Sequence, residues 1–368
     1  MTDIFSFADD LGPEKIIHLY DPSTDLKAIV VIDNVAAGPG IGGTRMASDV
    51  TLEECIRLAR AMTLKNAAAS LPHGGAKSII FADPKMPREE KERLIRSFAH
   101  ALADIKDYIV GPDMGTDETC MAWIHDVIHR SVGLPREIGG IPLDEIGATA
   151  FGLTAAIDVA SEFIDLDLDG ARVVIQGFGS VGAHAARFLG EKGAVLIAAA
   201  DSRGATLNPD GLDVAALVDW KQAGRSVSEF GGGTTLALDD LVGVACDIWI
   251  PAARPDVLTE DNAGRLQARI FAEGANIPAT PGAERMLAER GVLVLPDFIA
   301  NAGGVICGAE EFRGGTQQSA FDAIDEKIRS NMREVLERSR ADGILPREAA
   351  LRLAEIRVRT AMALRKSY

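Results

Sequence analysis

The sequence predicts an α/β protein of two domains, the second built on a doubly wound, mostly parallel sheet. Three observations lead to this prediction. The chain has 368 residues, which is more than one hydrophobic core usually serves. Short apolar runs alternate with helical patterns along most of its length, as in parallel sheets. A glycine-rich turn over 177–182 follows one such run and opens a helical pattern, an arrangement typical of nucleotide-binding sheets.

The first part of the chain alternates strand and helix patterns. We expect, in order, a strand at 27–33, a glycine-rich turn at 38–43, a helix from 51 to 65, a buried strand at 78–82, a helix at 88–105 and a strand at 108–113. The composition then becomes loop-like over 136–142, and a helix over 147–163 carries the chain onward. This stretch is interpreted as the crossing between the domains.

The second part repeats short apolar strands between helical patterns. Strands are expected at 173–176, 195–200, 248–250, 270–272 and 292–295. Two helices follow Gln317, with a stop at Gly343 and a restart at Pro346, which suits a first helical turn. We therefore expect a first domain at 1–140 and a second at 141–334, with helices over about 335–368 packing back on the first.

Two lysines stand in a segment over 63–80 that carries almost no other charge. Lys65 follows the apolar residues of its helix at helical spacings, which predicts that it points inward. Lys77 opens the buried strand, and Gly74 and Gly75 before it would let backbone approach a ligand closely. Burial and a second cation both disfavour an ammonium, so a lysine of this pair can become a base. A single lysine would be expected to extend to solvent, but two beside a Gly-Gly turn favour a site.

The turn Gly177-Phe178-Gly179-Ser180-Val181-Gly182 matches the pattern G-x-G-x-x-G between a strand and a helix. Such glycines permit a tight turn, and the helix N-terminus attracts a pyrophosphate. A glycine-rich turn without a nucleotide is the less favoured interpretation. The next strand ends at Asp201, which would accept the ribose hydroxyls of NAD and repel a 2′-phosphate. Ser202 and Arg203 leave NADP open as the alternative, because an arginine beside that carboxylate could hold the phosphate.

Composition and charge exclude several classes of protein. The net charge of −16 opposes binding to nucleic acid or to anionic membranes. No apolar run approaches bilayer length, and the first residues show no leader pattern. The four cysteines are scattered, which suits a reducing compartment, so we expect a cytoplasmic protein. His125 and His129 have a metal-like spacing without an evident third ligand, and we assign no metal.

Seven sequence blocks occur in an order that is highly specific. They are Gly42-Gly43-Thr44-Arg45-Met46, Met62-Thr63-Leu64-Lys65-Asn66-Ala67, Gly74-Gly75-Ala76-Lys77, Gly111-Pro112-Asp113-Met114-Gly115-Thr116, the turn over 177–182, Glu273-Gly274-Ala275-Asn276 and Asn301-Ala302-Gly303-Gly304-Val305. In these blocks the chain resembles the glutamate, leucine, phenylalanine and valine dehydrogenase family of amino-acid dehydrogenases, and its pattern is most similar to the leucine and phenylalanine enzymes. The resemblance implies a substrate-binding and oligomerisation domain at 1–140, a Rossmann domain at 141–334, an active site in the cleft between them, and a homo-oligomer.

The resemblance also implies roles for individual residues. Lys65 would bind the substrate α-carboxylate, Lys77 would activate water, and Asp113 would exchange a proton with the amine. Alone, Asp113 would be read at least as readily as a turn residue after Gly-Pro. Contacts to the nicotinamide end of the cofactor would come from Thr149 and Asn276, with Asn276 also touching substrate, and Asn301 would bind the cofactor.

These groups fit an oxidative deamination that yields a 2-oxo acid and ammonia. In glutamate-specific members of the family, a lysine precedes the Gly-Gly pair and binds the γ-carboxylate. This chain has Ile41 there, so an apolar L-amino acid is expected. The side-chain pocket would be lined by Ile41, Gly42, Gly43, Gly111, Val305 and Gly308. Two alternatives remain, a glutamate enzyme that uses NADP and a non-catalytic amino-acid or nucleotide sensor. The intact Lys65, Lys77 and Asp113 disfavour the sensor.

Overall fold

The computed structural model describes residues 5–365, and its internal contacts divide the chain into two units. Unit 1 comprises Met1–Leu143, Val305–Ala323 and Leu351–Tyr368, and unit 2 comprises Asp144–Gly304 and Ile324–Ala350. The predicted boundaries differ from this division in three segments, because 141–143 and 305–323 group with unit 1 and 335–350 with unit 2. Contacts between distant parts of the chain decide this grouping, and sequence order does not reveal them. The predicted ranges also include residues 1–4 and 366–368, which lie outside the described residues.

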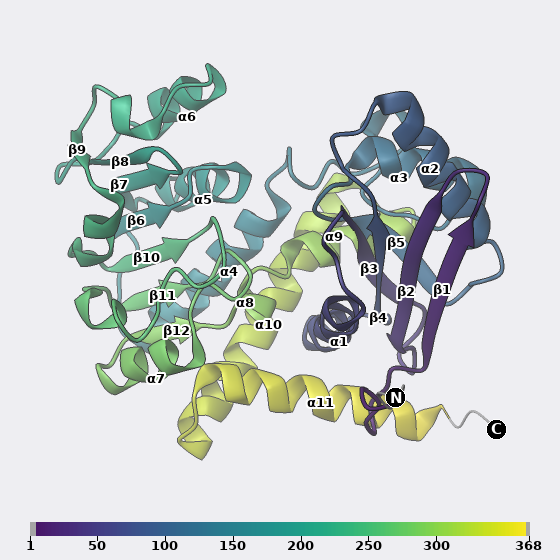
Figure 1. Cartoon of the computed structure of the whole chain (residues 1–368). Helices are drawn as coiled ribbons and strands as arrows, with labels where there is room; N and C mark the ends of the chain where they lie inside the picture. The colour runs from purple at the N-terminus through teal and green to yellow at the C-terminus, as the bar shows by residue number, and fades with distance from the viewer. Residues whose placement is uncertain (1–4, 366–368) are drawn as a thin grey trace. The chain divides into compact units, whose positions relative to one another are not determined.

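Unit 1 is built on a five-stranded sheet of order β1-β2-β4-β3-β5 (Figure 1). Its strands are β1 Lys15–Asp21, β2 Leu26–Asn34, β3 Gly40–Ala47, β4 Gly74–Phe81 and β5 Tyr108–Pro112. β1 and β4 are antiparallel to β2, whereas β3 is parallel to both β4 and β5. The inner strand β3 therefore lies between the two strands that carry the lysine and aspartate motifs.

Helices cover both faces of this sheet. Helix α1, Leu52–Ala68, packs on one face against Ile29, Val31 and Ile79, and Thr51 caps its first turn. Helices α2, Arg88–Ala101, and α3, Glu118–Ile128, form the apolar core on the other face. The short helix η1, Arg136–Ile138, follows α3. The sheet thus forms the middle layer of three.

Strand β3 contradicts the predicted turn at 38–43, since the extended conformation begins at Gly40. Its glycines serve close packing between strands. A Cβ on Gly42 would lie 1.7 Å from the carbonyl oxygen of Ala76. Gly75, expected to approach a ligand, lies within β4, and a Cβ there would lie 2.1 Å from the backbone nitrogen of Thr63 on α1. This glycine therefore admits the helix backbone, which explains it without a ligand.

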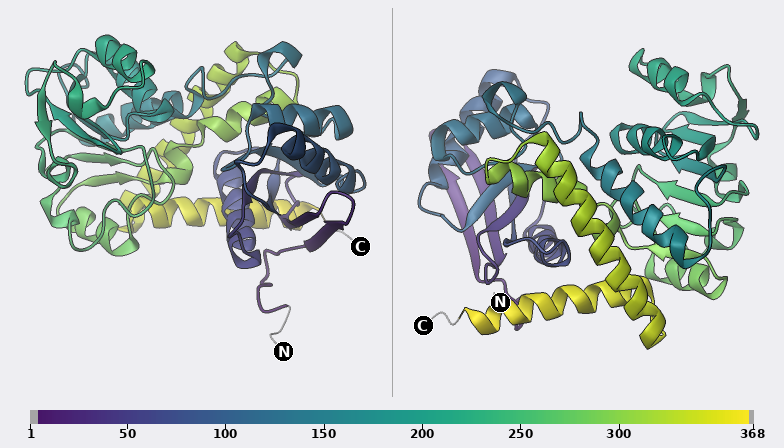
Figure 2. Two further views of the ribbon diagram at one scale, coloured as in Figure 1. Left: turned by 45° about the horizontal axis from the view of Figure 1, so that its top comes forward. Right: turned by 180° about the vertical axis from the view of Figure 1, so that it is seen from behind.

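Unit 2 contains a seven-stranded sheet of order β12-β11-β10-β6-β7-β8-β9 (Figures 1 and 2). Its strands are β6 Arg172–Gln176, β7 Val195–Asp201, β8 Gly204–Leu207, β9 Thr234–Leu236, β10 Ile248–Pro251, β11 Ile270–Ala272 and β12 Leu293–Leu295. The strands from β12 to β7 are parallel, and β8 and β9 extend the edge in antiparallel fashion. The predicted doubly wound parallel sheet is confirmed, and the sequence analysis missed β8 and β9.

The chain leaves β6 for β7 on one side and later returns to place β10 on the other side of β6. Such a reversal creates a crevice at the carboxyl ends of the strands, where open α/β sheets bind ligands. Two helices, α4 Ala148–Phe163 and α5 Ser180–Gly190, pack against each other and against the sheet. The other elements of this unit are α6 Val214–Gln222, η2 Val227–Glu229, η3 Leu238–Gly243, η4 Ala263–Arg265, α7 Pro281–Glu289 and α8 Asp297–Ala300.

Three helices end the chain, α9 Gly303–Phe312, α10 Gln317–Asp342 and α11 Pro346–Leu364. The last two begin and end where Gln317, Gly343 and Pro346 predicted. Each of the three helices is shared between the two contact units. Within residues 5–365, none of the helices combines the length and apolar character needed to cross a bilayer.

Candidate functional site

Lys77 and Asp113 form an ion pair across strand β3. Lys77 lies in β4 and is 6% exposed, and Asp113 directly follows β5. The strand between them carries Gly43, where a Cβ would lie 3.2 Å from Lys77 Nζ and 2.8 Å from Asp113 Cβ. The missing side chain at this glycine therefore leaves the space in which the lysine reaches the aspartate.

The Asp113 carboxylate is held in its ionised form by several partners. Burial alone would raise its pKa, but the nearby Lys77 ammonium lowers it below the usual range, with further help from Arg45. The backbone N–H of Met114 donates to Asp113 Oδ1 at 2.6 Å, and Arg45 Nη2 lies 3.4 Å from the same oxygen. Arg45 also binds Glu54 Oε1 at 2.5 Å. Arg45 belongs to one of the seven sequence blocks, but the sequence did not indicate its contact with Asp113.

The electrostatic setting of Lys77 differs from the predicted one. The sequence analysis expected a neighbouring cation, Lys65, to disfavour its charge, whereas the group in contact with it is a carboxylate. Lys65 is half-buried in the last turn of α1. The next residue, Asn66, donates through Nδ2 to the carbonyl oxygens of Ile41 at 3.2 Å and Gly74 at 2.6 Å. These bonds attach the end of α1 to β3 and β4 and so fix the backbone beside Lys65.

The predicted pocket residues of unit 1 include a buried apolar residue and two neighbouring glycines. Ile41 in β3 is 3% exposed. Gly111 in β5 and Gly308 in α9 both face Val132, because a Cβ on either would lie 3.5 Å and 3.4 Å from Val132 Cγ2. These are ordinary contact distances, so each position has room for a methyl group. Val305, at the start of the same stretch of α9, is half-buried.

The turn over 177–182 has the geometry that a pyrophosphate requires. Gly177 has a φ of +100°, and a Cβ on Gly182 would lie 2.0 Å from the carbonyl oxygen of Gly177. These two positions therefore need glycine for the tight turn and for close helix packing. Gly179 at the N-terminus of α5 has open space where its Cβ would lie, so a ligand can approach its backbone. Phe178 is buried, Val181 is half-buried, and Ser180 donates to the carbonyl oxygen of Asp144 at 3.0 Å.

The carboxylate of Asp201 is occupied by partners within unit 2. Its two oxygens accept four hydrogen bonds, from Lys221 Nζ at 2.7 Å, the Val227 N–H at 2.9 Å, Ser226 Oγ at 3.1 Å and the Arg203 N–H at 2.9 Å. Burial opposes ionisation, yet these donors lower its pKa to about 2. Four bonds use the lone pairs that a carboxylate offers. The expected contact with both ribose hydroxyls would therefore require one of these bonds to break.

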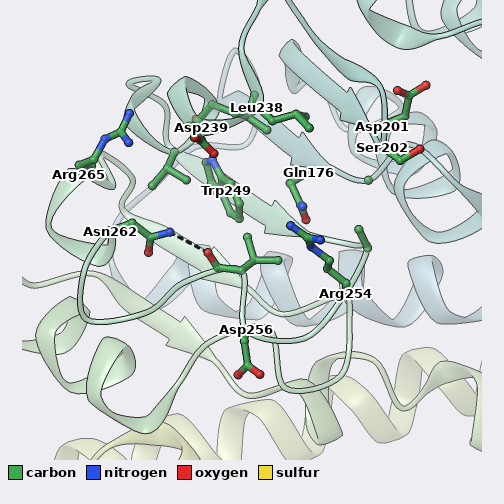
Figure 3. A pocket seen from close by; sticks show the side chains of 15 residues that line it. Gln176, Asp201, Ser202, Leu238, Asp239, Trp249, Arg254, Asp256, Asn262 and Arg265 are labelled. Atoms are coloured by element: carbon green, nitrogen blue, oxygen red, sulfur yellow. Dashed lines mark hydrogen bonds between the residues drawn. The ribbon is translucent and has the colours of Figure 1, made fainter.

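A cavity of about 560 Å³ lies at the carboxyl ends of β6, β7 and β10. Gln176, Asp201, Ser202, Trp249 and Arg254 are among its lining residues (Figure 3). In Figure 3, the Arg254 and Gln176 side chains extend toward each other, whereas the Asp201 carboxylate points away from both. Gly177 also lines this cavity, so the space adjoins the glycine turn. The sequence analysis missed Gln176, Trp249 and Arg254, which lie outside the glycine pattern.

The predicted cofactor contacts Asn276, Asn301 and Thr149 of unit 2 lie near one another. Asn301 Nδ2 donates to Asn276 Oδ1 at 2.9 Å, which brings the two asparagines together. Thr149 lies in the first turn of α4, and a Cβ on Gly303 would lie 3.1 Å from its Cα. The stretch that follows Asn301 is therefore packed against Thr149.

The histidine pair that suggested a metal spacing has another arrangement. His125 lies in the last turn of α3, and His129 adopts the left-handed conformation directly after the end of this helix. The two rings contact each other edge to face, with centroids 5.3 Å apart. Within residues 5–365, no group of three or more potential ligands gathers around a possible metal ion.

The fold and the glycine turn define a two-unit α/β protein with a dinucleotide-binding sheet. The family model for glutamate/leucine/phenylalanine/valine dehydrogenase matches residues 139–366, and the model for the dimerisation domain of the same enzymes matches residues 13–130. The chain belongs to this family of amino-acid dehydrogenases, which are oxidoreductases that use nicotinamide cofactors. The family resemblance in the sequence is thus confirmed.

Individual relatives carry several substrate names. The chain is 37% identical to a glutamate dehydrogenase of Aeropyrum pernix, covering 90% of this chain and 85% of that one. It is 36% identical to an NAD-specific glutamate dehydrogenase A of Halobacterium salinarum, over 87% and 78% of the two chains. A hetero-hexameric glutamate dehydrogenase of Thermus thermophilus in a leucine-bound form matches with a TM-score of 0.86 and 31% identity, over 97% and 91%. An L-tryptophan dehydrogenase of Nostoc punctiforme matches with a TM-score of 0.76 and 26% identity, over 95% and 97%.

Proposed function

We propose that the protein catalyses the reversible oxidative deamination of apolar L-amino acids to 2-oxo acids and ammonia. The observation that carries the substrate class is the buried Ile41 directly before Gly42 and Gly43. A side-chain carboxylate facing isoleucine would lose its hydration without gaining a hydrogen-bond or charge partner. This loss costs roughly several kcal/mol of binding free energy. Leucine, valine or phenylalanine side chains incur no such cost.

The residues of unit 1 supply the acid–base chemistry of this proposal. Lys65 binds the substrate α-carboxylate. In the contact between Lys77 and Asp113, the Lys77 ammonium passes its proton to the Asp113 carboxylate, and the neutral Lys77 amine then accepts a proton from the water that attacks Cα once the hydride has left. Asp113 gives the proton it received to the departing nitrogen, which leaves as ammonia. The nicotinamide cofactor, when bound, accepts the hydride from Cα. Asn276, Asn301 and Thr149 are proposed to orient its nicotinamide end.

Glutamate is the second candidate substrate, and the names of the relatives favour it. Two proteins that are 37% and 36% identical to this chain are called glutamate dehydrogenases. Glutamate would need a cation or several hydrogen-bond donors at its γ-carboxylate, in place of the partner that Ile41 cannot provide. The choice between glutamate and an apolar amino acid therefore depends on which groups contact the end of the substrate side chain.

Measuring kcat/KM for leucine, valine, phenylalanine and glutamate tests the proposal. We expect the best apolar substrate to exceed glutamate by at least about tenfold, the ratio that a difference of 1.4 kcal/mol produces. Ile41→Lys should then improve glutamate relative to leucine. A wild-type preference for glutamate would overturn the apolar assignment and leave the reaction class intact.

The glycines beside Val132 allow the pocket size to be tested separately. Gly111→Ala and Gly308→Val fill space, so they should shift preference from phenylalanine toward valine by about 1 to 3 kcal/mol. Gly190→Ala serves as the control, because open space surrounds its Cβ position at the end of α5. If the ratio of kcat/KM for phenylalanine to kcat/KM for valine is the same in the wild type and in both variants, these glycines do not line the pocket.

We propose NAD as the first cofactor and NADP as the alternative, now with Lys221 as the residue that decides between them. The Lys221 ammonium offsets the negative charge of Asp201, which weakens the repulsion of a 2′-phosphate. Lys221→Met should therefore lower the ratio of kcat/KM with NADP to kcat/KM with NAD by about tenfold, the effect expected from removing one charge at a partly exposed site. Lys192→Met removes a comparable pair with Asp158 and is the control. An unchanged NADP to NAD ratio would exclude Lys221 from cofactor choice.

We also propose a homo-oligomer, because the family model of the first domain is described as a dimerisation domain and one matching structure as a hetero-hexamer. Light scattering of the purified protein would give the number of subunits. The four free cysteines suit a reducing compartment, which supports the cytoplasm as the proposed location.

A further inference from the structure

The loop after β11 contains a strained turn next to a proposed substrate contact. Ile277 follows Asn276 and has a φ of +49°, in the left-handed region. A β-branched residue rarely adopts this conformation, because its side chain crowds the neighbouring carbonyl. Ile277 is also 55% exposed, so burial of its side chain does not explain the conformation. Such strain persists only where surrounding groups hold the backbone, and it is frequent at functional sites.

Hydrogen bonds on both sides hold the peptide groups of Ile277. Its N–H donates to Asp297 Oδ2 at 2.9 Å, and its carbonyl oxygen accepts from the Asp256 N–H at 3.0 Å. The backbone N–H of Asn301 donates to the carbonyl oxygen of Asp297 at 2.7 Å. Because Asn301 also binds the Asn276 side chain, Asp297 is linked to both asparagines of the proposed site.

Arg347, in the first turn of α11, holds Asp297 in place. Its guanidinium binds Asp297 Oδ1 at 2.9 Å, Glu273 Oε2 at 2.6 Å and Glu284 Oε1 at 2.6 Å. The Asp297 N–H also donates to Glu273 Oε2 at 2.8 Å. The three carboxylates are between 0% and 7% exposed at their side chains, so this arrangement lies in the interior of unit 2. A planar guanidinium suits it, since its donors point in fixed directions.

We propose that Arg347 and Asp297 form a clamp that keeps the turn at Asn276 and Ile277 in the conformation required for turnover. Arg347 is thus a positioning residue that acts through Asp297 on Asn276. The inference deepens the proposed function, because it rests on Asn276 contacting substrate and nicotinamide. The clamp itself is a property of the loop and can be measured without turnover.

Arg347→Lys tests the clamp by kinetics while keeping a positive charge among the buried carboxylates. A lysine cannot bind three carboxylates in the fixed directions of the fork, so Asp297 should lose its position. We expect kcat to fall at least tenfold with a smaller change in the KM of the amino acid, since misplaced catalytic groups lower turnover. Arg290→Gln is the control, because Arg290 binds carbonyl oxygens of Ala263 and Leu266, both at 2.7 Å, elsewhere in unit 2. A kcat within twofold of wild type for Arg347→Lys would overturn the proposal.

Ile277→Gly provides a rescue that a merely structural role of Arg347 would not produce. Glycine adopts a positive φ without crowding, so the turn depends less on the clamp. The double variant Arg347→Lys/Ile277→Gly should have a kcat at least threefold higher than that of Arg347→Lys alone. Its unfolding temperature should not rise in proportion. A double variant with the same or a lower kcat would show that strain at residue 277 is not what Arg347 controls.

Hydrogen exchange separates this inference from the proposed function. Exchange at the Ile277 amide should be at least tenfold faster in Arg347→Lys than in wild type and in Arg290→Gln. If no amino acid is deaminated with NAD or NADP but exchange increases, the clamp holds and the proposed function fails. Equal exchange in all three proteins would overturn the clamp, whatever the activity. Comparison by circular dichroism identifies a variant that has simply unfolded, in which case Asp297→Asn takes its place with the same expected results.

Discussion

Two charged side chains of unit 1, Lys77 and Asp113, are in contact because Gly43, on the strand between them, has no side chain. Their contact places the proposed base and the proposed acid within direct reach, so that a proton can pass between them without an intervening water. Arg45 and the Met114 N–H stabilise the carboxylate form of Asp113. At this scale, the chemistry depends on a small number of donors placed by the strand ends.

Replacing either lysine should separate catalysis from substrate binding. Lys77→Ala is expected to lower kcat by about a hundredfold to ten-thousandfold, because the general base is lost. Lys65→Ala should mainly raise the KM of the amino acid, because the α-carboxylate loses its anchor. Steady-state kinetics and fluorescence titration with the reduced cofactor would measure both effects. A Lys77→Ala enzyme with near-normal kcat would remove this residue from the proposed mechanism.

The Asp201 carboxylate should contribute to stability in a defined pH range. Its pKa is about 2 in the folded protein and 3.8 in the reference state, so the folded form holds the proton less tightly. The resulting stabilisation is present above pH 3.8 and is lost as pH falls through 2. The stability difference between wild type and Asp201→Asn should therefore narrow from pH 5 to pH 2, roughly, in urea unfolding. A difference that stays constant over this range would contradict the assignment.

Strand β3 shows how an element with little side-chain mass can define a site. Its glycines let β4 approach closely, and the one at 43 leaves the passage for Lys77. The strand is held by pairing to β4 and β5 on both sides. The strand therefore contributes to the site mainly by the space that its glycines leave.

Gly43→Ala tests this role. The new methyl group would lie 2.6 Å from the Pro112 carbonyl oxygen and 2.8 Å from Asp113 Cβ, so the end of β5 must shift. We expect kcat to fall at least about tenfold and stability to fall by about 1 to 3 kcal/mol, as for other overpacked positions. Gly190→Ala, in helix α5 where space is open, should leave kcat unchanged and should not lower stability. Full activity in Gly43→Ala would show that the lysine reaches its partner by another route.

Helix α11 supports the helix that carries Lys65. Arg357 Nη1 donates to the carbonyl oxygens of Ala68 at 2.8 Å and Ala67 at 3.3 Å, which end helix α1. A cation at this end also favours the helix dipole. Arg357→Ala should lower stability by about 1 to 3 kcal/mol, as for charged hydrogen bonds, and raise the KM of the amino acid. Arg357→Lys should cause a smaller loss of stability and a smaller rise in KM than Arg357→Ala. Unfolding curves and steady-state kinetics of the two variants would measure these differences. An unchanged KM would limit Arg357 to a structural role.

At the scale of the whole molecule, sequence patterns predicted the elements that bury continuous apolar runs. The strands at 248–250 and 270–272 and the helix at 147–163 were found within one residue of the expected bounds. β3 was missed because glycines resemble a turn when the neighbouring strands are unknown. The partly exposed edge strand β1 and the short strands β8 and β9 carry weak apolar patterns and were missed as well.

In the candidate site, too, features with a local sequence pattern could be predicted, and features that depend on distant segments could not. The glycine turn and the buried position of Lys77 follow local patterns, so the sequence predicted them. The partners of these residues could not be predicted, because Lys221 at Asp201 and Arg347 at Asp297 come from distant segments. A charged side chain carries no local signal of the group that it will meet after folding. The apolar pocket stays a prediction that substrate kinetics must decide.

The strand order of unit 1 has a consequence for the way the chain is synthesised. β3 emerges from the ribosome before either of its neighbours, β4 at 74–81 and β5 at 108–112. Its glycine-rich half buries few side chains of its own, so it cannot be stable until both neighbours have emerged. Residues 40–47 therefore lack at least one of these neighbours while about 65 further residues are translated, roughly 3 to 13 seconds at ordinary translation rates. A nascent chain stalled before β5 should expose this segment to proteases, whereas one stalled well beyond it should protect the segment.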